Sequence, residues 1–273
     1  MKRQTSIAVA IVLVALSAEV AAAPKAELWP MWERSDESNT AEIDHSAWQG
    51  FLDRYLDTQS GDGIYLVRYG AVSASDRQAL DSYIDYLQAI DPRDYSKAEQ
   101  KAYWVNLYNA ATVRVVLDHP TKKSILRMGD GFFKLGPWND TLLNIAGEQV
   151  TLNAIEHRIL RPIWQDRRIH FAVNCASLGC PNLADQVYTS RNTDNLLDQH
   201  EWAYINHPRG VSFDAKGRLT ASKIFAWYRI DFAENPQQLL EYFASHADEP
   251  LASQLRAHDG RLAYDYDWDL NGT

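Results

Sequence analysis

The sequence predicts a helix-rich α+β fold around a small, mainly antiparallel sheet. Three observations lead to this class: apolar residues at helical spacing are more common than alternating ones, the alternating stretches are short and scattered, and no regular βαβ order appears. No internal repeat, low-complexity stretch or linker divides the chain. We therefore expect residues 41–273 to form a single globular domain.

The N-terminus has the order of a secretory signal peptide. Lys2 and Arg3 precede an apolar run at 7–16, and small residues follow it. The run is too short to span a bilayer. We expect residues 1–22 to be cleaved after Ala22, which predicts a periplasmic or secreted protein.

The next segment, residues 23–40, is polar and lacks helix caps, so we expect a flexible N-terminal arm. Nothing later in the chain approaches the length of a transmembrane segment. The formal charge of −9 argues against nucleic-acid binding, which depends on Lys and Arg at the phosphates. We assign most of the nine Trp and fourteen Tyr to the core, with a peptide or glycan groove as the alternative.

Helical spacing and end signals predict the helices. The first starts near Ile43, Ser75 caps the second, and Ser96 caps the longest, which His119-Pro120 stops. Further helices are expected at 153–160, 192–206, 222–231 and 236–245.

Alternating segments and turn residues predict the strands. Residues 121–141 have neither pattern and are expected to form an irregular loop. The expected strands are 64–69, 142–145, 148–152, 168–175 and 262–268, with another hairpin around 214–217.

Both cysteines lie in one stretch, where the strand expected at 168–175 runs into a Ser/Gly loop. A cysteine acts as a nucleophile when its thiolate is populated, which a nearby imidazole promotes. Cys175 stands at the strand end, and the backbone amides of 176–179 are placed to form an oxyanion hole. Cys175 is therefore the candidate nucleophile.

The general base is expected from outside this strand. His170 is five residues before Cys175, and an odd separation places the two side chains on opposite faces of a strand. His157, on the short helix 153–160, is the expected supplier of the imidazole. Glu156 is about 100° from His157 around that helix. We assign Glu156 to a capping box with Asn153, and keep the orientation of His157 as its alternative role.

Three asparagines complete the candidate site. Asn106 and Asn109 lie one turn apart on the otherwise apolar helix after Ser96. Burying their amides without partners costs about 1–3 kcal/mol each, so they indicate either a polar site or a backbone clamp. Asn174 precedes Cys175, and each of the three asparagines is a candidate to orient the base or polarise a substrate carbonyl.

Two further interpretations of the cysteines stay open. In an oxidising compartment, Cys175 and Cys180 are close enough in sequence to form a disulfide, which would silence the nucleophile. Zinc ligation by the cysteines and a histidine lacks the paired spacings of common zinc sites. We therefore predict no metal and no cofactor.

Several separated motifs follow one another along the chain, at 103–110, 152–162, 168–181, 222–228 and 231–232. Together they resemble the domain of unknown function 547 (DUF547) family. The similarity covers about residues 75–245 and implies a fold related to papain-like or transglutaminase-like cysteine enzymes. Those folds place the cysteine at a helix start before the histidine strand, whereas Cys175 follows the expected strand.

Our first hypothesis is a cysteine-dependent hydrolase or acyltransferase on amide or ester bonds in the cell envelope. Its substrate would be an envelope peptide, a glycan or a small molecule. The alternative is a non-catalytic periplasmic binding or scaffolding module with a Cys175–Cys180 disulfide. A glycosidase ranks third, because no Asp/Glu pair is singled out by position.

Overall fold

The computed structural model describes residues 24–129 and 135–273. The predicted signal peptide, residues 1–22, lies outside the described residues. The helix-rich α+β class is confirmed, although the strands within the described ranges form three small sheets instead of one.

The helices follow the predicted order, with differences at their ends. Ser96 caps α3 as predicted, and its Oγ accepts a hydrogen bond from the Glu99 N–H at 3.3 Å. Ser73, not Ser75, caps α2. The α-helices are α1 (Ser46–Tyr55), α2 (Ala74–Gln88), α3 (Lys97–Asp118), α4 (Leu152–Ala154), α5 (Arg161–Trp164), α6 (Thr193–Ile205), α7 (Ile224–Trp227), α8 (Arg229–Phe232), α9 (Pro236–His246) and α10 (Leu251–Arg256).

Shorter helical turns connect these elements. Five are 3₁₀ turns and one, η5, is a π-helix that continues α4 into α5. They are η1 (Pro30–Glu33), η2 (Tyr69–Ala71), η3 (Pro92–Asp94), η4 (Ile125–Arg127), η5 (Ile155–Leu160) and η6 (Arg167–Phe171).

The strands pair mainly antiparallel, as predicted. β1 pairs with β2, β3 with β4 and β5 with β6 in antiparallel register, and β6 pairs with β7 in parallel. The hairpins predicted near 146–147 and 214–217 are both present. The strands are β1 (Leu56–Asp57), β2 (Leu66–Val67), β3 (Leu143–Ile145), β4 (Glu148–Val150), β5 (Val211–Phe213), β6 (Leu219–Ser222) and β7 (Leu262–Asp265).

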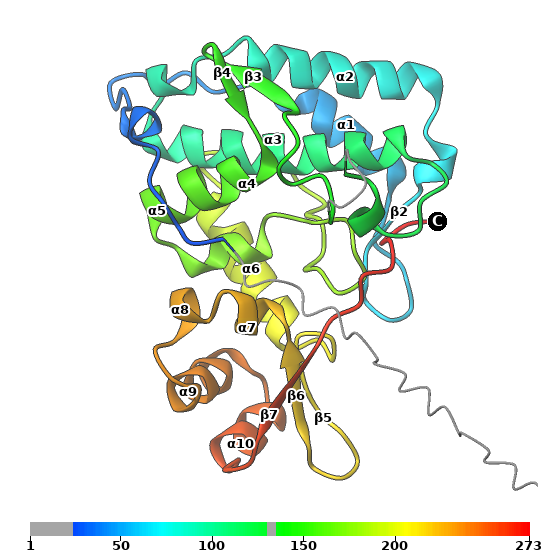
Figure 1. The fold of residues 1–273 in the computed structure, drawn as a ribbon, viewed down its shortest axis with the longest axis vertical. Coiled ribbons are helices and arrows are strands. Elements are labelled where there is room, and N and C mark those ends of the chain that lie inside the picture. Colours follow the sequence, from blue (N-terminus) through cyan, green and yellow to red (C-terminus); the bar gives the residue numbers. More distant parts are fainter. Residues whose placement is uncertain (1–23, 130–134) are drawn as a thin grey trace, which may run out of the picture.

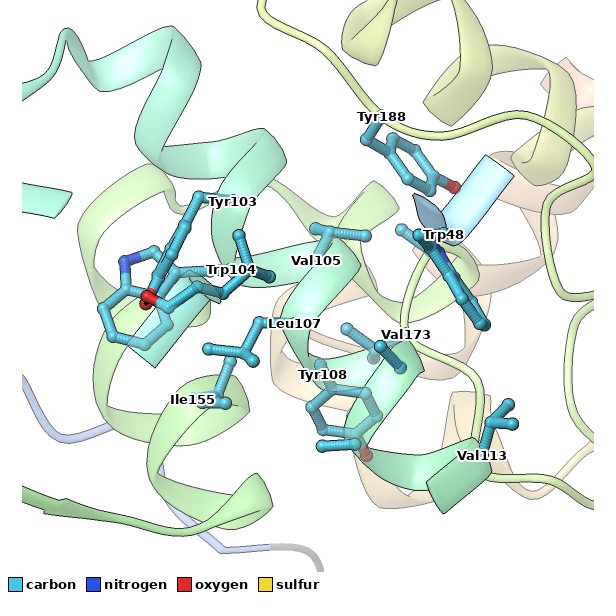
Figure 2. Packing of buried hydrophobic residues seen from close by; sticks show 14 of the residues in the cluster. Trp48, Tyr103, Trp104, Val105, Leu107, Tyr108, Val113, Ile155, Val173 and Tyr188 are labelled. Atoms are coloured by element: carbon cyan, nitrogen blue, oxygen red, sulfur yellow. The ribbon is translucent and has the colours of Figure 1, made fainter. Parts of the chain in front are cut away.

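Helix α3 runs through the core. Every residue from 99 to 113 is buried, because this helix is apolar on nearly all its faces. Figure 2 shows its side chains together with Trp48 of α1, Ile155 of η5 and Val173, which follows η6. A polar side chain between residues 99 and 113 of α3 is therefore buried and needs a partner inside the protein.

The C-terminal part of the chain packs as a second cluster below α3 (Figure 1). After β7 the chain runs back toward β2, where Gly272 pairs with Val67. On the way Leu270 pairs with Ser177, beside both cysteines. This return path places aromatic residues of the C-terminal segment at the cysteine loop.

Pro162 explains how the N-terminal segment is held. Proline has no N–H, so it leaves the Arg158 carbonyl without its usual helical donor. The Trp29 N–H donates to this carbonyl at 2.9 Å, and the Glu27 N–H donates to the carbonyl of His157 at 2.9 Å. Trp32 is 1% exposed and packs against Trp104. Glu27, Trp29 and Trp32 therefore attach this segment to η5 and α3.

The prediction of a strand at 168–175 is wrong. Residues 167–171 form the 3₁₀ turn η6, and an irregular loop follows. No strand lies beside this segment among the described residues, and an α3 side chain binds its backbone instead. Asn109 Nδ2 donates to the Ala172 carbonyl at 2.9 Å, and the Asn174 N–H donates to Asn109 Oδ1 at 2.8 Å.

Among the described residues, no helix combines the length and the apolar character needed to cross a membrane.

Candidate functional site

A cavity of about 280 Å³ brings most of the predicted site residues together. Its polar side is formed by η5, η6 and the cysteine loop, and its aromatic side by α7 and the C-terminal segment. The polar lining residues are Tyr108, Asn139, Asn153, Glu156, His157, His170, Cys175, Cys180, Tyr228 and Tyr266, and the apolar ones are Pro24, Leu126, Leu135, Trp138, Val173, Ile224, Trp227 and Trp268.

Cys175 is surrounded by hydrogen-bonding groups. Its Sγ lies 3.0 Å from Cys180 Sγ, 3.0 Å from the Tyr266 hydroxyl and 3.2 Å from the Ser177 hydroxyl. Donation from Cys180, then from Ser177 and Tyr266, lowers the pKa of Cys175 despite its burial. Burial raises the pKa of Cys180 well above the usual thiol value. Cys175 is therefore the cysteine better suited to be a thiolate.

Both cysteines are free thiols in this structure. Their sulfurs are 3.0 Å apart, whereas a disulfide requires about 2.05 Å. Cys175 is partly exposed in the cavity, and Cys180 is 3% exposed. The predicted Cys175–Cys180 bridge is thus not formed here, although the two sulfurs are in contact.

Several backbone N–H groups of the cysteine loop, residues 174–181, already donate hydrogen bonds within the protein. The Ala176 N–H donates to Asn174 Oδ1 at 2.8 Å, the Leu178 N–H to the Asp269 carbonyl at 2.8 Å and the Gly179 N–H to the Asp267 carbonyl at 2.9 Å. Three of the four amides expected to form an oxyanion hole are thus committed within the protein. Asn174 Nδ2 also donates to the Pro181 carbonyl at 2.7 Å, so Asn174 holds the loop closed.

His157 lies on the cavity wall and contacts Arg161. Its Nδ1 is 3.1 Å from Nη1 of Arg161, and a guanidinium can only donate. Nδ1 therefore accepts, and the proton of the neutral ring is on Nε2. Burial lowers the pKa of His157, Glu156 opposes this, and the Arg161 charge lowers the pKa further. This tautomer suits donation to a substrate and disfavours the predicted role of general base.

His170 also lines the cavity, and strand alternation does not separate it from Cys175, because residues 167–171 form a 3₁₀ turn. Its Nε2 lies 2.7 Å from Asp231 Oδ2, and its Nδ1 lies 3.5 Å from Glu156 Oε1. The ring stacks on Tyr228 with 3.9 Å between centroids. A carboxylate therefore faces each ring nitrogen of His170.

Glu156 belongs to a charged cluster that also contains His170, Asp231 and Arg161, and it does not cap the helix. Thr151 is the cap, and its side chain accepts from the Ala154 N–H. Glu156 is 5% exposed, and the Tyr108 hydroxyl lies 3.4 Å from its Oε2. Burial acts to raise the pKa of Glu156, but its interactions with His157, His170 and Arg161 lower it to about 2. Glu156 is therefore a carboxylate at neutral pH.

Asn106 and Asn109 are backbone clamps and do not line the cavity. Asn106 Nδ2 donates to the Tyr188 carbonyl at 2.7 Å, and the Tyr188 N–H donates to Asn106 Oδ1 at 3.1 Å. Asn109 binds the backbone after η6 in the same two-sided way. The sequence left a polar site and a backbone clamp open for these two asparagines, and their contacts are those of a backbone clamp.

Four site residues were missed by reasoning from the sequence. Arg161, in α5, donates to Asp231 Oδ2 at 2.7 Å and so joins α5 to α8 within the charged cluster. Tyr228 stacks on His170, and the Tyr266 hydroxyl contacts Cys175. Arg161, Tyr228 and Asp231 stand in the motifs that carried the family resemblance, and this was the available signal. Tyr266 had no signal beyond alternation, which was interpreted as a strand.

The described residues hold no group of three or more His, Cys, Asp or Glu side chains arranged to bind a metal ion.

Comparison with known proteins gives one match. Residues 92–205 match the model of a family described as "Protein of unknown function, DUF547". No curated protein and no solved structure matches the chain. The matched range includes Glu156, His157, His170 and both cysteines, and it ends before α7 and the C-terminal aromatic residues.

Proposed function

Residues 92–205 belong to the DUF547 family, and from this premise and the cavity geometry we propose a cysteine-dependent hydrolase or acyltransferase acting on amide or ester bonds. One observation carries the proposal. The partly exposed Cys175 sulfur lies on the wall of the cavity, with two hydroxyls and a thiol within 3.2 Å. These groups stabilise a thiolate without a histidine in direct contact.

The reaction follows from this arrangement. The Cys175 thiolate attacks the substrate carbonyl, and the carbon–nitrogen or carbon–oxygen bond breaks as the leaving group takes a proton from solvent. Water or a second nucleophile then attacks the thioester and releases the thiol. His157, as an Nε2–H donor on the same cavity, is assigned to polarise the carbonyl oxygen. The rings of Trp227 and Trp268, whose centroids are 5.5 Å apart, are assigned to form the wall that contacts the acyl group.

The test is trapping of the acyl-enzyme. The purified chain is incubated with p-nitrophenyl esters and p-nitroanilides of short acyl groups, and its intact mass is followed with the release of nitrophenol or nitroaniline. We expect an acyl adduct on wild type and none on Cys175→Ala. Ser177→Ala, which loses one donor to the sulfur, should react more slowly. Asn195→Ala, exposed on α6, is the matched control and should react like wild type.

A chain that is alkylated at Cys175 by iodoacetamide but acquires no acyl group from any of these substrates would contradict the proposal. So would a Cys175→Ala variant that turns over like wild type.

A second candidate, a non-catalytic binding module for an envelope peptide or glycan, is favoured by a separate observation. The amides of residues 176, 178 and 179 are committed, and among the described residues no histidine is hydrogen-bonded to Cys175. Binding can be followed through the fluorescence of Trp227 and Trp268, which lie in the cavity. Unchanged affinity in Cys175→Ala, together with no acyl adduct in wild type, would favour binding over catalysis.

We also propose that the protein acts in the periplasm or outside the cell. The support is the order of charged, apolar and small residues in 1–22. Fractionation of cells and N-terminal sequencing test it. A mature protein that starts at Ala23 supports export, and an unprocessed chain confined to the cytoplasm contradicts it.

A further inference from the structure

Cys175 and Cys180 face each other across a loop whose backbone is fixed. Asn174 Nδ2 closes the loop onto the Pro181 carbonyl, and the amides of Leu178 and Gly179 bind the C-terminal segment. The sulfurs are 3.0 Å apart, and the Cys175 N–H donates to Cys180 Sγ at 3.0 Å. Closure to about 2.05 Å needs a movement of only about 1 Å. The loop thus holds the two thiols ready to react with each other.

The two thiols differ in access. Cys175 is partly exposed in the cavity, whereas Cys180 is 3% exposed. An external reagent therefore meets Cys175 first. The hydrogen bonds that lower the pKa of Cys175, and the burial that raises the pKa of Cys180, act in the same direction. An accessible thiol with a lowered pKa and a second thiol in contact with it favour thiol–disulfide exchange.

We propose that Cys175 and Cys180 are a reversible dithiol–disulfide pair, oxidised by low-molecular-weight disulfides, in which Cys175 reacts first and Cys180 resolves. The Cys175 thiolate attacks one sulfur of the small disulfide, which releases one small thiolate. Cys180 then loses its proton to solvent and attacks Cys175 Sγ, which releases the second. One disulfide is reduced to two thiols, and the protein dithiol becomes a disulfide.

The pair is also a switch for the cavity, and this consequence rests on the proposed function. Oxidation removes the Cys175 nucleophile and its hydrogen bonds to Ser177 and Tyr266. Reduction by small thiols restores both. The acyl-transfer activity would therefore be present in the dithiol form and absent in the disulfide form.

The test uses the full chain and glutathione as the probe. The protein is equilibrated over a range of reduced-to-oxidised glutathione ratios, quenched with acid, unfolded in urea, labelled with maleimide at neutral pH and weighed intact. We expect one transition from a doubly labelled chain to an unlabelled chain that carries no glutathione and stays monomeric on a non-reducing gel. A wild type that stays doubly labelled throughout, or that forms linked dimers, would overturn the proposal.

Two conservative variants test the order of the steps. Cys180→Ser lacks the resolving thiol, so it should accumulate a glutathione adduct on Cys175. Cys175→Ser should gain an adduct far more slowly, because Cys180 is buried. Equal rates of adduct formation in the two variants would overturn the assigned roles. Circular dichroism confirms that each variant is folded before its rate is compared.

The exchange assay contains no acyl substrate, so the two proposals fail independently. A disulfide that forms in a chain without acyl-transfer activity contradicts the proposed function alone. An acyl-enzyme on a chain whose thiols resist oxidised glutathione contradicts the redox pair alone.

Discussion

Nη1 of Arg161 lies 3.1 Å from Nδ1 of His157, one helical turn away. This contact places the imidazole proton on Nε2, because the guanidinium has no lone pair to offer. The same guanidinium donates to Asp231 and to the Pro24 carbonyl. Arg161 therefore fixes the chemical role of His157 and joins three separate segments at the cavity.

Replacing Arg161 should change the titration of His157. The arginine charge lowers the pKa of His157, so Arg161→Gln should raise this pKa, and Arg161→Lys, which keeps a charge, should raise it less. Nitrogen chemical shifts of the His157 ring report both the pKa and the tautomer. An Nδ1–H tautomer in wild type at neutral pH would contradict the assignment.

The pKa of the Cys175 thiol should be visible in its alkylation. Because hydrogen bonds lower this pKa, the reaction with iodoacetamide should stay fast at pH values below the usual thiol range of about 8.5. Tyr266→Phe removes one donor and should shift the rate profile to higher pH. Tyr264→Phe, two residues earlier on β7, is the control and should leave the profile in place. A wild-type profile centred at or above the usual thiol pKa would refute this.

Asn106→Ala should destabilise the protein strongly. The change leaves the buried N–H and carbonyl of Tyr188 without their partner, at a cost of about 2–4 kcal/mol in the free energy of unfolding. Urea denaturation measures the loss. Asn195→Ala, exposed on α6, should change stability little, since it exposes no buried group. Similar midpoints for the two variants would show that the clamp contributes nothing.

The stability of the protein should fall between pH 6.5 and pH 4 because of buried histidines. Burial lowers the pKa of His45, which is 3% exposed, to about 4. The unfolded chain binds a proton below about pH 6.5 while the folded chain does not, so stability is lost as the pH falls through this window, by about 3 kcal/mol for His45.

His45→Gln isolates this contribution. The neutral amide does not titrate, so urea denaturation at several pH values should show a smaller loss of stability than in wild type. Part of the loss should remain, because the pKa of His200 is also lowered to about 4. If the free energy of unfolding changes with pH by the same amount in wild type and variant, His45 is excluded as a source of the pH dependence.

Local patterns were sufficient for several elements. Ser96 and the apolar run after it determined α3, and the turns at 146–147 and 214–217 determined their hairpins, because caps and turn residues act on neighbouring backbone. The same patterns failed at 168–175. There the backbone takes its hydrogen bonds from Asn109, about 65 residues away, and no local rule anticipates that partner.

The sequence by itself determined the helix-rich α+β class, the long buried helix α3 and the importance of the stretch that contains Cys175 and Cys180. Only the tertiary structure decided which groups meet there. Tyr228 and Tyr266 reach the cavity from distant parts of the chain, Asp231 meets His170 and Arg161 behind it, and Arg161 sets the tautomer of His157. Helical and strand periodicity depends on near neighbours, whereas the chemistry of a buried site depends on contacts that the chain makes after long loops close.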